Sequence, residues 1–286
     1  MATTGFDGLR VLALESRRSE EMARLIASAG GTPTVAPSMR EVPLESNTEA
    51  LAFAESLLAG GQDMVIFLTG VGTRALSRVV ESAHPREKLV EALRRVTVVA
   101  RGPKPVAALR ELDVPVTIAV PEPNTWREVL GALDARSESI PLKGCRIAVQ
   151  EYGVSNPELL AGLATRGAQV TRVPVYQWSL PEDLGPLRNA IRGIANADFA
   201  VVLFTTSVQV VHLFKVAGEM GLEDAVRGAL FRMVVASIGP TTSEELQRYR
   251  VPIDLEPSHP KMGYLVKETA ERSRELLSLK RSKESR

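Results

Sequence analysis

Hydroxyl-bearing residues and glycines cluster at four turns of the sequence, near Thr69, Gly102, Thr205 and Gly239. Each turn lies between an apolar segment typical of a buried strand and the start of a predicted helix. A helix that begins just past a strand points free backbone N–H groups and the positive end of its dipole outward. The pattern predicts a site for carboxylate or phosphate groups, although an ordinary well-capped strand-to-helix turn looks the same.

The turn at Gly239 shows this pattern in its fullest form. An apolar run over residues 233–238 precedes it, and Pro240 follows the glycine directly. Thr241 is predicted to be the N-cap of the next helix, with Glu244 three residues later as in a capping box. Thr242 adds a second hydroxyl at the same helix start.

The donors at these turns are mainly neutral hydroxyl and backbone N–H groups. Such a set suits a large, flexible polycarboxylate better than a compact phosphate, and three nearby cations could add charge. The predicted ligand-binding residues are Thr69, Gly102, Thr205, Thr206, Ser207, Gly239, Thr241 and Thr242, with the cations Arg17, Arg18 and Lys104.

Tyr176 is the candidate for proton transfer. It lies in the segment Arg172–Trp178, which is predicted to be an extended connector between two halves of the chain. A phenol at such a junction can donate a proton or a hydrogen bond to a ligand. A packing role for the ring is an equally good interpretation of the pattern.

Other kinds of chemistry find little support in the sequence. His84, His212 and His259 have no partners at metal-ligand spacing, so no metal site is predicted, and His212 fits a buried core position. The segment Thr69–Arg74 lacks the third glycine of a dinucleotide fingerprint, and no cofactor is expected. Cys145, the single cysteine, excludes an internal disulfide and is predicted to be buried filler.

Charge and hydropathy exclude several classes of partner. The 35 Lys and Arg residues nearly balance 34 Asp and Glu residues, and a net charge of +1 gives no support for binding nucleic acid or a membrane surface. No apolar run reaches the length of about 18 residues that a membrane span needs, and the N-terminus does not resemble a secretory leader. A monomeric cytoplasmic protein that binds a small molecule is expected.

The predicted elements repeat along the chain. Strands and helices alternate, which predicts parallel sheets, and 286 residues suit two domains. The segment at Gly8 matches that at Gly144 with an offset of 136 residues, Asp63 matches Asp198 with an offset of 135, and Gly102 matches Gly239 with an offset of 137. An offset this constant indicates an internal duplication.

Taken together, these segments resemble uroporphyrinogen-III synthases. Each motif is short, but their order and spacing are specific, and they span about residues 8–268. The motifs are Gly8-Leu-Arg-Val-Leu, Asp63-Met-Val-Ile-Phe-Leu-Thr, Gly102-Pro-Lys-Pro-Val-Ala-Ala-Leu, Pro174-Val-Tyr-Gln, Asp198-Phe-Ala-Val-Val-Leu-Phe-Thr-Thr and Ser237-Ile-Gly-Pro-Thr-Thr.

The resemblance implies an α/β fold of two similar doubly wound parallel-sheet domains, joined by a two-stranded connector around a deep interdomain cleft. One domain would be discontinuous, formed by residues 1–37 plus 177–286, and the other would cover residues 42–172. Residues 38–41 and 173–176 would be the connector strands.

The resemblance also implies an activity: the cofactor-free cyclodehydration of linear hydroxymethylbilane to uroporphyrinogen III. In this family the site is the interdomain cleft, and main-chain N–H groups hold most of the substrate's carboxylates. Tyr176 matches the tyrosine proposed to assist departure of the substrate's hydroxyl group. Thr241 and Thr242 match the paired threonines of the family's Gly-Pro-Thr-Thr turn.

The sequence departs from the family pattern at three places. Pro105 and Leu68 replace residues that are usually hydroxyl-bearing, and the segment Gly70–Gly72 is atypical. These departures keep open a non-catalytic sensor that binds a tetrapyrrole or another polycarboxylate on the same fold. A bilobal binding protein of the periplasmic type is a third hypothesis, which the missing leader sequence disfavours.

Overall fold

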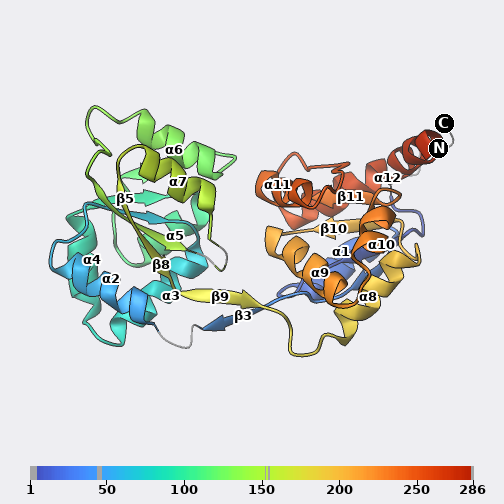
Figure 1. Cartoon of the computed structure of the whole chain (residues 1–286), viewed down its shortest axis with the longest axis horizontal. Coiled ribbons are helices and arrows are strands. Elements are labelled where there is room, and N and C mark those ends of the chain that lie inside the picture. Colours follow the sequence, from blue (N-terminus) through green and yellow to red (C-terminus); the bar gives the residue numbers. More distant parts are fainter. Residues whose placement is uncertain (1–4, 44–46, 152, 154, 285–286) are drawn as a thin grey trace. The chain divides into compact units, whose positions relative to one another are not determined.

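The computed structural model describes residues 5–43, 47–151, 153 and 155–284. The chain forms two compact units, which the chain connects at two crossing points. Unit 1 consists of Met1–Arg40 and Ser179–Arg286, and unit 2 consists of Glu41–Trp178. Each unit is an α/β sandwich (Figure 1).

Unit 1 contains a four-stranded sheet in the order β11-β10-β1-β2, with every neighbouring pair parallel. Leu255 extends this sheet by a parallel bridge to Ala236 in β11. Its elements are β1 (Arg10–Ala13), α1 (Ser19–Ser28), β2 (Thr32–Val35), α8 (Gly185–Ala195), β10 (Val201–Phe204), α9 (Ser207–Glu219), α10 (Glu223–Leu230), β11 (Val234–Ser237), α11 (Pro240–Arg248) and α12 (Met262–Glu284).

Helices cover both faces of this sheet, because alternate strand residues enter two different cores. Leu12 and Val202 pack in one core with residues of α8, α9 and α10. Val11 and Val201 pack in the other core with residues of α1 and α12. All four strand residues are fully buried, which is why these strands read as continuous apolar runs rather than as alternating ones.

Unit 2 contains a five-stranded parallel sheet in the order β6-β5-β4-β7-β8. Helices α6 and α7 pack against each other and contribute Val129 and Leu159 to a core with Met64 and Ile147 of the sheet. Its elements are α2 (Thr48–Leu58), β4 (Met64–Phe67), α3 (Gly70–Glu81), α4 (Arg86–Arg94), β5 (Thr97–Ala100), α5 (Pro103–Glu111), β6 (Ile118–Ala119), α6 (Trp126–Asp134), β7 (Arg146–Glu151), α7 (Pro157–Thr165) and β8 (Gln169–Pro174).

Two further strands, β3 (Arg40–Pro43) and β9 (Tyr176–Ser179), pair with each other in a two-stranded sheet. They lie where the chain passes between the units. Both strands begin later than the predicted connector segments 38–41 and 173–176, and for β9 the reason is that residues up to Pro174 still belong to β8. The predicted α/β class with parallel sheets is confirmed.

The strands of the two repeats are exchanged. In unit 1 the first strand of the first repeat pairs with a strand of the second repeat, with Val11 opposite Val201. In unit 2 the first strand of the second repeat pairs with a strand of the first repeat, with Ile147 opposite Met64. Met64 and Val201 are therefore equivalent, with an offset of 137 residues. The offset of 135 predicted from Asp63 and Asp198 is wrong by two residues for this strand, because the segment between Asp198 and β10 is longer.

An arginine–aspartate pair links the repeats in each sheet. In unit 2, Arg146 donates from Nη2 to Asp63 Oδ1 at 2.6 Å, and from Nε and its backbone N–H to Oδ2 at 2.9 and 2.8 Å. These hydrogen bonds lower the pKa of Asp63 to about 2. In unit 1, Arg10 and Asp198 make a single longer contact of 3.7 Å.

We expect the pair in unit 2 to make stability depend on pH. Because the pKa of Asp63 is lower in the folded protein, the stabilisation is present above about pH 4 and is lost as the pH falls through about 2. The shift corresponds to about 2.5 kcal/mol at most, and exposure of 42% for both side chains reduces this to about 1 kcal/mol. Asp63→Asn should lower the free energy of unfolding in urea by about that amount at pH 7.

The matched control is Asp198→Asn, which removes the weaker pair of the other unit and should cost less. The difference between wild type and Asp63→Asn should shrink between about pH 4 and pH 2. Equal stability at pH 7, or a difference that grows on acidification, would contradict the assignment.

Candidate ligand-binding site

The predicted ligand-binding residues of unit 1 lie at one edge of its sheet. Strands β1, β10 and β11 are adjacent and parallel, so the turns after their carboxyl ends meet at the same edge, here called the carboxyl edge. The backbone N–H of Ile238 donates to the carbonyl of Phe204 at 2.9 Å, which joins two of these turns directly. Ligands of open α/β sheets bind at this edge.

The helix after Gly239 starts earlier than the sequence suggests. Gly239 is the N-cap and Pro240 the first helical residue, so the predicted capping box of Thr241 and Glu244 is wrong. Proline suits the first helical position because its φ is already helical and its missing N–H has no partner to lose there. The hydroxyl of Ser237 instead accepts a hydrogen bond from the Gly239 N–H at 3.4 Å.

The paired threonines of this turn have different environments. Thr242 is 3% exposed, and its N–H and that of Ser243 donate to the carbonyl of Gly239 at 3.0 and 3.1 Å. Thr241 is exposed. The hydroxyl that a ligand could reach at this turn is therefore that of Thr241, whereas Thr242 packs inside.

A buried network fixes the turn after β10. The Thr205 hydroxyl donates to Glu15 Oε2 at 2.5 Å and accepts from Gln209 Nε2 at 2.8 Å. The Thr205 N–H donates to Gln209 Oε1 at 2.7 Å. The N–H and the hydroxyl of Thr205 are thus satisfied internally. Thr205, Thr206 and Ser207 are all half-buried, and the Thr206 side chain makes no cap hydrogen bond.

Glu15 also occupies the turn after β1. Its Oε1 accepts the backbone N–H groups of Arg17 and Arg18 at 3.1 and 3.2 Å. The carboxylate therefore takes the place that an anionic ligand would have at this helix start. The Arg18 guanidinium pairs with Glu21 of the same helix, and the Arg17 side chain is exposed and has interactions of its own.

Sequence reasoning missed Glu15 and Gln209, which organise this edge. The available signal was the position of Glu15 at the end of an apolar strand, repeated by Glu151 at an offset of 136 residues. Glu151 is 3% exposed and accepts hydrogen bonds from Ser155 at 2.6 Å and from Arg172 at 3.0 Å. Each repeat therefore places one internally satisfied carboxylate at or just past the end of its first strand.

In unit 2, Thr69 and Gly102 start neighbouring helices at the carboxyl edge. Thr69 is the N-cap of α3 and accepts the Gly72 N–H at 3.0 Å, and Gly102 is the N-cap of α5. A Cβ at Gly70 would lie 2.5 Å from the carbonyl oxygen of Lys104, so the two helix starts require a glycine at this contact. The Lys104 side chain is exposed.

A buried amide explains the atypical segment Gly70–Gly72. Gln150 is fully buried, and a Cβ at Gly72 would lie 2.1 Å from its Nε2. The equivalent positions in unit 1 hold Leu14 and Gln209. In unit 1 the glutamine lies on the helix, opposite a leucine just past the end of the strand. In unit 2 the glutamine lies on the strand, opposite a glycine of the helix.

Several predicted residues lie elsewhere. Tyr176 begins β9, and its side chain lies outside the described part of the structure. His212 is buried and its Nδ1 lies 2.7 Å from the carbonyl of Ser38, which confirms the predicted core position, and burial lowers its pKa. Cys145 is half-buried, and burial raises the pKa of its thiol.

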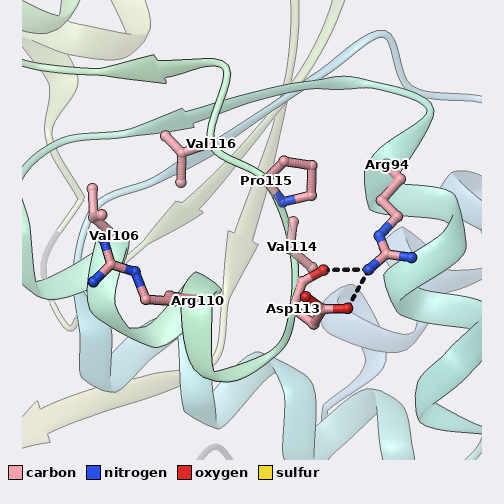
Figure 2. A pocket seen from close by; sticks show the side chains of 7 residues that line it. All are labelled: Arg94, Val106, Arg110, Asp113, Val114, Pro115 and Val116. Carbon is pink, nitrogen blue, oxygen red and sulfur yellow. Dashed lines mark hydrogen bonds and ion pairs between the residues drawn. The ribbon is translucent and has the colours of Figure 1, made fainter.

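Unit 2 also has an open hollow of about 460 Å³ (Figure 2). Its lining residues are Arg94, Val106, Arg110, Asp113, Val114, Pro115 and Val116. Arg94 donates to the Asp113 carbonyl at 2.7 Å and to its carboxylate. Residues 113–116 precede β6, so the hollow lies toward the amino ends of the strands and contains none of the predicted ligand-binding residues.

Within the described residues, no group of three or more His, Cys, Asp or Glu side chains is placed to hold a metal ion. Nor does any helix in that part of the chain have the length and apolarity needed to cross a membrane.

The fold and its edges define a duplicated, strand-exchanged α/β protein whose turns present hydroxyl and backbone N–H donors. The family model described as uroporphyrinogen-III synthase HemD matches residues 20–267. The chain belongs to this family.

Two curated proteins and a crystal structure are similar to most of this chain. The uncharacterized protein YjjA of Bacillus subtilis is 30% identical over 270 residues, covering 93% of this chain and 96% of its own. A Methanothermobacter thermautotrophicus protein provisionally named uroporphyrinogen-III synthase is 30% identical over 236 residues, covering 82% and 87%. A crystal structure of a mutant uroporphyrinogen III synthase from Thermus thermophilus has a TM-score of 0.73 at 24% identity, covering 94% and 99%.

The contact between Gly72 and Gln150 can be tested by mutation. Gly72→Ala should destabilise the protein by about 1–3 kcal/mol, because the new methyl group collides with the buried Gln150 amide. In a Gln150→Leu background, which copies Leu14 of unit 1, the same substitution should cost much less. The free energy of unfolding in urea measures both effects as a double-mutant cycle.

The control is Gly131→Ala in α6, where an added Cβ would meet no atom within 4 Å. That substitution should be neutral or stabilise by up to about 1 kcal/mol, as alanine does in helices. If Gly72→Ala behaves like Gly131→Ala, or if Gln150→Leu does not relieve its cost, Gln150 is not the reason for the glycine.

Proposed function

We propose that the protein is a uroporphyrinogen-III synthase. In this reaction the hydroxyl of the hydroxymethyl group of a linear tetrapyrrole leaves as water, and the methylene carbon stays on its ring as part of a cation. The substituted carbon of the last pyrrole ring attacks the resulting cation and forms a spiro intermediate. The macrocycle then closes with that pyrrole ring inverted. The observation that carries the proposal is the family match over residues 20–267, together with the donor-rich carboxyl edge of unit 1.

The reaction makes modest chemical demands on the protein. The pyrrole nitrogen stabilises the cation that forms when the hydroxyl group leaves, so no strong nucleophile is required. The protein must hold a flexible, polyanionic chain in the one geometry that favours attack at the substituted carbon, which is a positioning task. Helix starts suit this task because their N–H groups bind carboxylates without a mobile side chain.

We assign carboxylate binding in unit 1 to the helix starts at Ser207 and Gly239, with the hydroxyls of Thr206, Ser207 and Thr241. The support is their place on one edge and the exposure of Thr241. Thr205 and Thr242 act by shaping these turns, since their own polar groups are used or buried. In unit 2 we assign the corresponding role to Thr69, Gly102 and Lys104.

Tyr176 is assigned the role of general acid. An unperturbed phenol has a pKa of about 10, so it is protonated at neutral pH and can donate as the C–O bond of the hydroxymethyl group breaks. The proton and the hydroxyl leave together as water. This role rests on the match between Tyr176 and the family's tyrosine.

A second candidate function is tetrapyrrole binding without turnover, as in a sensor. The observation that favours it is the carboxyl edge of unit 2, where Leu68 and Pro105 stand at the positions of Thr205 and Thr242 in unit 1. The deciding experiment is incubation with freshly generated hydroxymethylbilane, followed by oxidation and separation of the type I and type III uroporphyrin isomers. Exclusive formation of the type I isomer at the spontaneous rate would favour the sensor.

We predict that Tyr176→Phe slows single-turnover formation of the type III isomer by about 10²-fold to 10⁴-fold, the usual range for general acid catalysis. The ring is kept, so thermal stability should stay close to that of wild type. If the variant forms the type III isomer within about twofold of the wild-type rate, Tyr176 is not the acid.

We predict further that Thr241→Val raises KM by about 10-fold to 100-fold, since one hydrogen bond to a charged carboxylate is lost. Unfolding should be unchanged because Thr241 is exposed. Thr205→Val is the contrasting variant: it breaks the buried network with Glu15 and Gln209 and should lower stability. An unchanged KM for Thr241→Val would remove its hydroxyl from the site.

A further inference from the structure

The loop of residues 256–261 lies beside the Gly239 turn in unit 1. Leu255 pairs with β11, and its carbonyl accepts the Ser237 N–H at 2.9 Å. The chain therefore leaves the sheet at the carboxyl edge before it enters α12. A Cβ at Gly239 would lie 3.7 Å from Cβ of Pro260, which brings the loop into contact with the start of α11.

Hydrogen bonds to one carboxylate hold this loop in place. Glu268, in the second turn of α12, accepts the Ser258 N–H at 2.9 Å and the Ser258 hydroxyl. These bonds lower the pKa of Glu268. The Lys261 N–H donates to the His259 carbonyl at 2.7 Å, which closes the turn. The loop is thus a defined structure at neutral pH, where Glu268 is ionised.

The loop and the first turn of α12 present two aromatic rings and a cation to solvent. The rings of His259 and Tyr264 lie 4.6 Å apart between centroids and are tilted by 39°. His259 and Lys261 are exposed, and Tyr264 is 41% exposed. Among the large hydrophobic side chains of the described residues, Phe231 and Leu279 are also exposed, but both lie toward the amino end of β11.

We propose that His259, Lys261 and Tyr264 form a binding subsite for a pyrrole ring that carries carboxylate side chains. The ring packs against Tyr264, and a carboxylate pairs with the Lys261 ammonium group while a neighbouring carboxylate reaches the start of α11. The aromatic face favours a flat ring, and the ammonium group favours an anion. The two features together therefore select a flat ring that carries a negative charge. The subsite deepens the proposed function and rests on it for the identity of the ring.

Binding can be measured without turnover. The probes are uroporphyrin III, by its fluorescence, and butane-1,2,3,4-tetracarboxylate, an aliphatic polyanion, by competition. Tyr264→Ala should weaken uroporphyrin binding by about 3-fold to 10-fold and leave tetracarboxylate binding unchanged, because stacking is lost and charge is kept. Tyr264→Phe should bind uroporphyrin within about twofold of wild type. Lys261→Gln should weaken both ligands by a few fold, with a smaller effect at high salt.

Two variants serve as controls. Phe231→Ala removes an exposed ring at the other edge of unit 1, and Lys267→Gln removes a lysine of α12 that lies 4.0 Å from Glu271. Both should bind uroporphyrin III like wild type. If Tyr264→Ala binds like these controls, or if Tyr264→Ala and Tyr264→Phe weaken binding equally, the subsite is wrong. Failure of wild type to bind uroporphyrin III also overturns it.

The isomer assay separates this inference from the proposed function. If the protein binds uroporphyrin III through Tyr264 and Lys261 but forms no type III isomer, the subsite stands and the proposed activity is wrong. If Tyr264→Ala forms the type III isomer as well as wild type and binds uroporphyrin III as tightly, the proposed activity stands and the subsite is wrong.

Discussion

Parallel pairing between strands of different repeats is the constraint on which the rest of the structure depends. In unit 1, β1 lies between β2 and β10, and in unit 2, β7 lies between β8 and β4. Without the exchanged partner, each first strand would expose a row of unpaired N–H and C=O groups in the middle of a sheet. Neither half of the sequence can therefore complete a sheet alone. The same pairing decides which turns become neighbours, because it aligns the carboxyl ends of β1, β10 and β11 in one unit.

The two units have kept the architecture of their common repeat and changed its carboxyl edge. Unit 1 has a hydroxyl at Thr205, held by Glu15 and Gln209, and an exposed hydroxyl at Thr241. Unit 2 has Leu68 and Lys104 at the corresponding positions. The carboxyl edge of unit 1 thus presents hydroxyl and N–H groups, whereas that of unit 2 has fewer hydroxyls and a cation.

The buried carboxylates Glu15 and Glu151 lie close to the turns at the carboxyl ends of the first strands of the two repeats. Each is satisfied by internal donors: Glu15 by Thr205 and two backbone N–H groups, and Glu151 by Ser155 and Arg172. A buried carboxylate with a full set of donors organises the backbone around it. Because its hydrogen bonds are made to nearby groups, it does not occupy the donors on neighbouring turns.

The sequence by itself determined the α/β class, the duplication and the positions of most turns, because these depend on local patterns. Apolar runs, capping residues and glycine–proline pairs act within a few residues of one another, and the repeat is visible as a constant offset. The match of motif order also identified the family. The early start of α11 at Pro240 and the equivalence of Met64 and Val201 in the two repeats were harder to predict, because each depends on a shift of one or two residues.

Only the tertiary structure decided how the edge residues divide their work. Thr205 and Thr206 are neighbours of the same chemical type. Glu15, 190 residues away from Thr205 in the chain, accepts a hydrogen bond from the Thr205 hydroxyl. Thr241 and Thr242 are likewise adjacent, but successive residues of a helix point in different directions, so one is buried and the other exposed. The glycine at position 72 of α3 makes sense only beside Gln150, which approaches it from strand β7. Such assignments depend on contacts between segments distant in sequence, and local patterns carry no record of them.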